Sequence, residues 1–175
     1  MNIDEGYPFI FQMNDRSETR KHLEYTLQYR FKSKKSNHTY IVRTERYINH
    51  CYCIKFFDKA HIHSDNKYSL RNSTFEPRRI LYTVMYIMLD VFKKDPKASF
   101  FFIGANDEKD EPGIATRRFR IYTRFVSSVI STKLFEHFRV NEISLYILVN
   151  KSAVKELSSF AEKLTAAVTT ELTNH

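Results

Sequence analysis

The stretch HLEYTLQYRFKS, residues 22–33, carries the pattern that decides the fold. Large apolar side chains alternate with polar ones along it, which is typical of a β-strand with one buried face. The alternating apolar set is Leu23, Tyr25, Leu27, Tyr29 and Phe31. Polar residues 34–37 follow and predict a turn, so we expect the chain to reverse and pair with this strand.

Two more strands are expected after that turn. Thr39–Thr44 places Tyr40 and Val42 on one side, and Tyr47–Phe57 is apolar on both sides. Because a strand that is apolar on both sides is covered on both faces, Tyr47–Phe57 predicts an interior strand. Three such segments joined by short polar links are typical of an antiparallel meander.

The second half of the chain alternates helical and strand patterns. Apolar residues recur at helical spacing in three segments, and two short apolar runs between them predict buried strands. The expected elements are a helix capped by Thr74, with Pro77 in its first turn and Pro96 after its end, a strand at Ala98–Ile103, a helix from about Ile114 to Phe135, a strand at Ile143–Val149, and a last helix capped by Ser152.

This order, β-β-β-α-β-α-β-α, predicts an α+β protein with a mixed, mostly antiparallel sheet flanked by about three helices. The 175 residues fit one domain, which we expect to span residues 22–175. Residues 1–21 are expected to form an N-terminal arm. Within it, the apolar patch Tyr7–Phe11 predicts either an edge strand or a segment that docks on the body.

The order of elements from residue 22 onward resembles that of the acetyltransferase (GNAT-type) fold, and this GNAT-like order is a likeness of topology alone. Short motifs resemble those of a small Bacteroidetes-type domain family of unknown function, over roughly residues 25–150. That second resemblance implies no activity and no site residues. The motifs are Tyr29–Ser33, Tyr40–Val42, Asp90–Pro96, Phe100–Gly104, Asp107–Glu111 and Arg117–Phe119.

Charge and apolar content limit the class of protein. The net charge of +8 favours an anionic partner such as nucleic acid. Met1–Glu5 has acids where a secretion signal has bases, and the longest apolar stretch, Ile80–Phe92, is too short to cross a bilayer. We therefore expect a cytoplasmic protein that does not enter membranes.

Cys51 and Cys53 are expected to be free thiols, because a disulfide between them would be strained.

One helix face carries a candidate anion-binding strip. Arg117, Arg120 and Arg124 lie at i, i+3 and i+7 and so share a face that suits phosphate groups. The alternative is an ordinary exposed face whose charge is balanced by the acidic residues 107–111, which lie just before the helix.

A second candidate group is Arg71, Arg78 and Arg79, which lie around the start of the first helix. The GNAT resemblance implies a pyrophosphate held at such a helix start by backbone N–H groups of a Gly-rich loop. Tyr68–Arg79 contains no glycine, and Pro77 removes one donor. These arginines are therefore expected to bind an anion through side chains only, and we expect no cofactor.

Histidine and cysteine side chains gather in one region. Because Cys and His ligate zinc, His50, Cys51, Cys53, His61 and His63 form a candidate metal or thiol site. Their spacing matches no zinc knuckle and nothing indicates an oxyanion hole. We therefore expect core cysteines and loop histidines, with no metal and no catalytic residues.

These patterns favour a non-catalytic binding or interaction domain whose partner is another protein or a second copy. The Tyr7–Phe11 patch is the expected surface for that role. One alternative is a nucleic-acid-binding protein that uses the arginine face. The other is a degenerate or divergent GNAT-type acyltransferase with a cleft near residues 71–80.

Overall fold

The computed structural model describes residues 5–68, 76–105, 110–111 and 114–173. The chain divides into two compact units, Met1–Pro96 and Lys97–His175. Seven strands and three α-helices occur in the described part, and the strand pairings within each unit are antiparallel. These findings confirm the predicted α+β class with mostly antiparallel strands and three helices.

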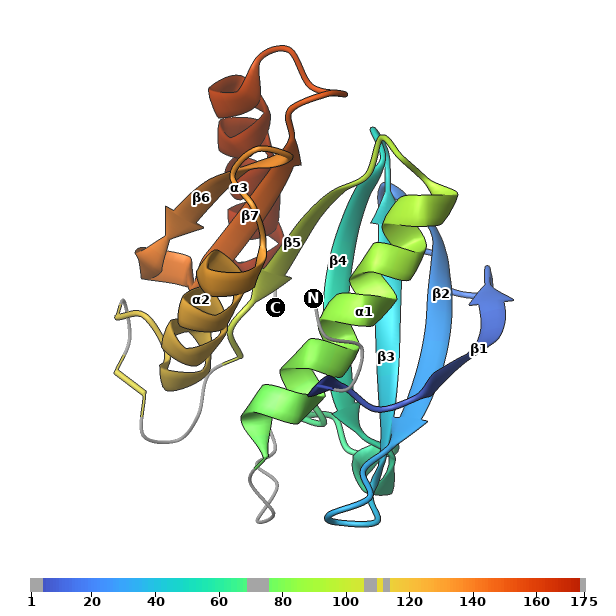
Figure 1. Cartoon of the computed structure of the whole chain (residues 1–175). Coiled ribbons are helices and arrows are strands. Elements are labelled where there is room, and N and C mark those ends of the chain that lie inside the picture. Colours follow the sequence, from blue (N-terminus) through green and yellow to red (C-terminus); the bar gives the residue numbers. More distant parts are fainter. Residues whose placement is uncertain (1–4, 69–75, 106–109, 112–113, 174–175) are drawn as a thin grey trace. The chain divides into compact units, whose positions relative to one another are not determined.

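The first unit is a four-stranded antiparallel meander with one helix across a face of it (Figure 1). Each strand pairs with the next strand in sequence. The hydroxyl of Tyr29 donates to Asp90 of the helix at 2.8 Å, which places the Tyr29 side of the meander under the helix. The elements are β1 (Phe9–Asp15), β2 (Leu23–Lys32), β3 (Thr39–Tyr47), β4 (Cys51–Asp58), the 3-10 turn η2 (Lys59–His61) and α1 (Pro77–Lys94).

The boundaries of α1 confirm the prediction from its prolines. Pro77 occupies the first turn, where its missing N–H is not needed, and Asp95 caps the other end by donating its N–H to the Val91 carbonyl at 2.8 Å. The predicted cap is wrong: the N-cap position is Glu76, without a side-chain cap, and Thr74 lies outside the described residues. The side chains that α1 buries are Ile80, Leu81, Tyr82, Thr83, Val84, Met85, Ile87, Met88 and Val91.

The predicted strand order is wrong at its start, because β1 precedes the first expected strand. An edge strand with exposed residues on both sides has no alternating pattern, so periodicity does not reveal it. The turn between the next two strands was also misplaced. Tyr47 ends β3, and Asn49 and His50 form the turn with left-handed φ values of 60° and 56°.

The second unit is a three-stranded antiparallel sheet in the order β5-β7-β6, with a helix on each face (Figure 1). The central strand β7 is buried along its whole length, as expected for a strand covered on both sides. The elements are β5 (Ser99–Ile103), α2 (Arg117–Val129), β6 (Phe135–Val140), the 3-10 turn η3 (Asn141–Ile143), β7 (Leu145–Asn150) and α3 (Leu157–Thr173).

The prediction of one helix from about Ile114 to Phe135 is wrong at both ends. The helix stops at Val129, because Ile130 takes an extended conformation, and Phe135 begins strand β6. The observed order is therefore β-β-β-β-α-β-α-β-β-α. The expected cap of the last helix was also misplaced: α3 starts at Leu157, and the Ser152 hydroxyl donates to Asn150 at 2.7 Å instead.

Candidate arginine site on the second unit

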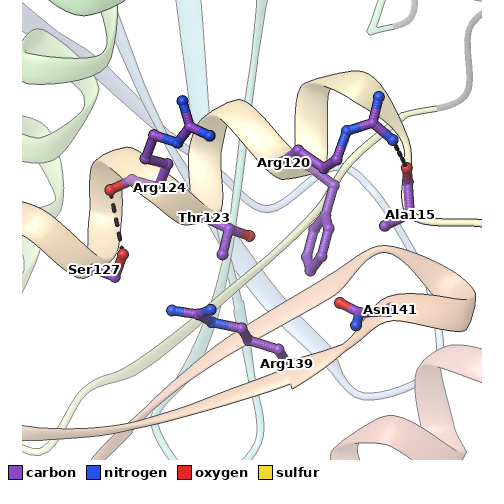
Figure 2. Close-up of a pocket in the computed structure, with 8 residues that line it drawn as sticks. Ala115, Arg120, Thr123, Arg124, Ser127, Arg139 and Asn141 are labelled. Atoms are coloured by element: carbon purple, nitrogen blue, oxygen red, sulfur yellow. Dashed lines mark hydrogen bonds between the residues drawn. The ribbon is translucent and has the colours of Figure 1, made fainter.

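A pocket of about 480 Å³ lies between α2 and the segment formed by β6 and η3 (Figure 2). Among the described residues, its lining includes three arginines, two hydroxyl-bearing residues and one asparagine, and no acidic residue. Such a set of donors suits an anion. The lining residues are Ala115, Phe119, Arg120, Thr123, Arg124, Ser127, Arg139 and Asn141.

Two of the three arginines predicted on this helix line the pocket. Arg120 and Arg124 are exposed and lie about one helical turn apart, so the predicted shared face is present. Figure 2 shows both side chains extending from α2 away from β6, and the Nη1 atom of Arg120 donates to the Ala115 carbonyl at 2.6 Å. Arg117 is exposed at the first position of α2 and does not line the pocket.

The third guanidinium group, that of Arg139, comes from β6. In Figure 2 its side chain extends below Thr123, whereas those of Arg120 and Arg124 extend from α2 the other way, so the three guanidinium groups do not gather at one point. Arg139 lies opposite Tyr146 in the β6–β7 pairing, and its guanidinium lies 5.6 Å from the centre of the Tyr146 ring. The tyrosine ring therefore positions this arginine through a cation–π contact.

The polar side chains between the arginines complete the site. The Thr123 hydroxyl is buried and has no hydrogen-bond partner among the described residues, and the Ser127 hydroxyl donates to the Arg124 carbonyl at 3.2 Å. A buried hydroxyl without a partner loses the hydrogen bonds it makes to water in the unfolded chain. A ligand oxygen in the pocket is one way to restore such a bond.

The arginines of this site have no carboxylate partner among the described residues. Within the described residues, no ion pair joins Arg120, Arg124 or Arg139 to an acidic side chain. Asp110 accepts a hydrogen bond from the backbone N–H of Arg117 at 3.1 Å, which places its carboxylate at the start of α2. Other members of the 107–111 acidic loop, 107–109, lie outside the described residues.

A nearby histidine adds no charge at neutral pH. Burial, and then the positive charge of Arg139, lower the pKa of His137 below its ordinary value of 6.5. Its Nδ1 atom lies 2.6 Å from the hydroxyl oxygen of Tyr146. His137 therefore supports the ring under Arg139 as a neutral side chain.

The start of α2 is held by a compact group of hydrogen bonds. Thr116 caps the helix by accepting from the Phe119 N–H at 3.1 Å and donates to the Gly104 carbonyl at 3.2 Å. The backbone N–H of Thr116 donates to the Ser144 hydroxyl at 2.9 Å. These bonds attach α2 to the ends of β5 and β7, and so determine where Arg120 and Arg124 lie.

We expect Gly104→Ala to lower the free energy of unfolding by about 2 kcal/mol. A Cβ atom at this position would lie 2.6 Å from both the Thr116 hydroxyl and the Phe119 Cβ, and 2.9 Å from the Phe119 Cα. Because one of these atoms is backbone, α2 must shift to relieve the contact. Urea unfolding followed by circular dichroism measures the change, and Ala105→Ser is the neighbouring control. A Gly104→Ala protein as stable as the wild type would contradict the close approach.

The second predicted arginine group lies in the first unit and already has partners. Arg78 contacts Glu5 at 3.3 Å and lies over the Tyr82 ring, and Arg79 lies 4.3 Å from the centre of the Tyr7 ring. Arg71 lies outside the described residues, as do residues 69–75 as a whole. The structure thus leaves untested whether Arg71 joins the other two.

The cysteines of the candidate metal or thiol site are buried, and one of its histidines is paired with an aspartate. Cys51 and Cys53 are buried free thiols, and burial raises the pKa of Cys51 far above its ordinary value. His50 contacts Asp95 at 2.8 Å. Across the described ranges, no three His, Cys, Asp or Glu side chains are grouped so as to hold a metal ion.

Sequence reasoning found two of the pocket arginines and missed the rest of the site. Helical periodicity was enough for Arg120 and Arg124, which belong to one element. Arg139 and Asn141 were missed because residues 136–142 were predicted to be neither helix nor strand, and no local motif in residues 135–141 marks a binding site.

Comparison with protein-family models, with curated proteins and with solved structures finds no match. The resemblances drawn from the sequence motifs therefore stay predictions. No helix in the described part has the length and apolar character needed to span a membrane.

Proposed function

We propose that this protein binds nucleic acid through the phosphate groups of the backbone, using the surface of α2 and β6. The observation that carries the proposal is the set of three arginines, Arg120, Arg124 and Arg139, that line one pocket and have no paired carboxylate in the described part. Arginine binds phosphate oxygens with paired N–H donors, and backbone phosphates supply most of the affinity in such complexes.

A polymer with repeated charges fits this surface better than a single small anion. The three guanidinium groups do not gather at one point (Figure 2), and Arg120 and Arg124 are both exposed. Their Cα atoms are separated by about 6 Å along the helix axis, at a rise of about 1.5 Å per residue. Neighbouring phosphates of one strand can therefore meet successive arginines, and the net charge of +8 favours the approach of the polymer.

The acyltransferase alternative has less support. Its candidate anion site is the start of α1, where the Glu76 carboxylate already accepts hydrogen bonds from the hydroxyls of Tyr7 and Ser33. A carboxylate at this position repels a second anion. Pro77 also removes one of the N–H donors that a phosphate would use.

Fluorescence anisotropy with a labelled 20-nucleotide single strand at 50 mM and 200 mM salt tests the proposal. Three phosphate contacts predict a slope of about −2 in a plot of log affinity against log salt, or a loss of about 20-fold between the two concentrations. The variant R120A/R124A/R139A should flatten this slope toward zero and weaken binding at 50 mM salt by at least 10-fold.

A matched control separates the effect of the arginine site on binding from the effect of net charge. Lys32, Lys34 and Lys35 are exposed residues of the first unit, and K32A/K34A/K35A removes the same charge as the arginine variant. We expect this control to change binding less than threefold. Equal weakening by both triple variants would mean that net charge alone drives binding, and no binding by the wild type at 50 mM salt would exclude the proposed function.

A further inference from the structure

The outer edge of β1 has no partner strand in the described structure. β1 pairs with β2 along one side only and ends the row of strands in the first unit. The backbone N–H and C=O groups on the other side face solvent, and they can be paired by another extended chain. Three large apolar side chains of β1 are about half exposed: Ile10 at 50%, Phe11 at 48% and Met13 at 50%.

The sequence of this edge lacks the residues that usually prevent strand addition. Residues 9–14 contain no charge, no proline and no glycine, whereas protected edges carry such residues within the strand. The nearest such residues are Pro8 before the strand and Asp15 at its end, and Asp15 lies 3.4 Å from Arg43. One irregularity interrupts the pairing of β1 with β2, between Phe11 and Met13, so the segments on either side of it are the ones open to a new strand.

We propose that β1 pairs antiparallel with β1 of a second copy of this chain, across a two-fold axis. Each copy carries a net charge of +8, so most surfaces of two copies repel one another. Because residues 9–14 carry no charge, the β1 strands of two copies can pair without that repulsion. In an antiparallel pairing about a two-fold axis, the exposed Ile10 and Met13 of one copy meet the same side chains of the other in a self-complementary contact.

The same observations set the expected strength of the dimer. Three half-exposed side chains per copy form a patch much smaller than the ~800 Å² per partner of a standard interface. We therefore expect reversible association with a dissociation constant of about 10–100 µM. The proposed surface, residues 9–14, lies further along the chain than the Tyr7–Phe11 patch expected from the sequence. Tyr7 cannot belong to it, because its side chain is buried and its hydroxyl donates to Glu76 at 2.6 Å.

Sedimentation velocity from 5 to 500 µM, without nucleic acid and in 0.3 M salt, tests the dimer. The average mass should rise from one chain of 20.9 kDa toward two. Ile10→Lys and Met13→Lys should each keep the protein monomeric at 500 µM. Ile48→Lys and Ile62→Lys change side chains that are also exposed but lie outside β1, and they should associate like the wild type.

Hydrogen exchange of the wild type supplies a second measurement that needs no variant. Exchange of the outward-facing amides in residues 9–15 should slow at least fivefold between 5 and 500 µM, with little change elsewhere. A monomer at all concentrations would overturn the proposal. So would a mass increase that leaves exchange in β1 unchanged, or one that persists in Ile10→Lys and Met13→Lys. Association only when another protein is added would indicate a different partner for this edge and also overturn it.

Discussion

Replacing Glu45 with alanine is expected to lower the free energy of unfolding by about 3 kcal/mol. The carboxylate is only 2% exposed and accepts from Lys55 at 2.9 Å, from Arg20 at 2.8 Å and from the Tyr47 hydroxyl at 3.0 Å. Removing it leaves Lys55 without its counterion and leaves Arg20 with Glu18 alone, at 2.9 Å. Breaking a fully buried pair costs about 3–5 kcal/mol, and the low end applies because Lys55 and Arg20 stay about one-third exposed.

Urea unfolding at pH 7 measures this change, with Glu142→Ala as the matched control. Glu142 is an exposed glutamate with no ion pair to a described residue, so its loss should alter stability by less than about 0.5 kcal/mol. A Glu45→Ala protein that is as stable as the Glu142→Ala protein would contradict the assigned role of Glu45.

The effect of Glu45→Ala should also depend on pH. Burial raises the pKa of Glu45, but the positive charges of Lys55 and Arg20 outweigh burial and bring the pKa below its ordinary value of 4.5. A folded-state pKa below the unfolded one adds stability above about pH 4.5, and this stability is lost as the pH falls through the folded-state value. The difference between wild type and variant should therefore shrink between pH 5 and pH 3.

Replacing Tyr146 with alanine is expected to destabilise the protein by about 4 kcal/mol. The ring is fully buried, stacks on Phe102 at 5.1 Å, and contacts Phe119 and His137. Its loss leaves a large cavity between α2 and the sheet of the second unit. It also removes the surface that positions Arg139, so nucleic-acid binding should weaken along with stability.

Tyr146→Phe is the matched control, because it keeps the ring and removes only the hydroxyl near His137. We expect a cost of about 1 kcal/mol, the value of one ordinary hydrogen bond, and binding close to that of the wild type. Thermal and urea unfolding give the stabilities, and anisotropy gives the binding. If Tyr146→Phe cost as much as Tyr146→Ala, the hydroxyl and not the ring would dominate at this position.

The elements that were predicted well are those whose signals are local. The stripe of apolar side chains in α1, with Pro77 in its first turn and Pro96 after its end, sets that helix within a few residues. The alternation in β2 likewise predicted Leu23–Lys32 almost to the residue. Both elements bury one face, and a periodic pattern of apolar residues predicts an element of that kind.

The elements that were missed depend on pairing with distant strands. Phe135 and Phe138 fit the spacing of a helix, but the chain there pairs with β7 as β6. An edge strand was one of two expectations for Tyr7–Phe11, but the bounds of β1 were not predicted, because it has exposed side chains on both sides and is made a strand by hydrogen bonding to β2. Pairing energy comes from the partner strand, so it leaves little trace in the segment itself.

The sequence by itself determined the α+β class, the net charge of +8, the helical face of Arg120 and Arg124 and the burial of the two cysteines. Only the tertiary structure brought Arg139 beside that face, and only it left β1 at an edge. The physical reason is range: periodicity and charge act between residues a few positions apart, whereas a binding pocket and a sheet edge arise from contacts between segments far apart in the chain.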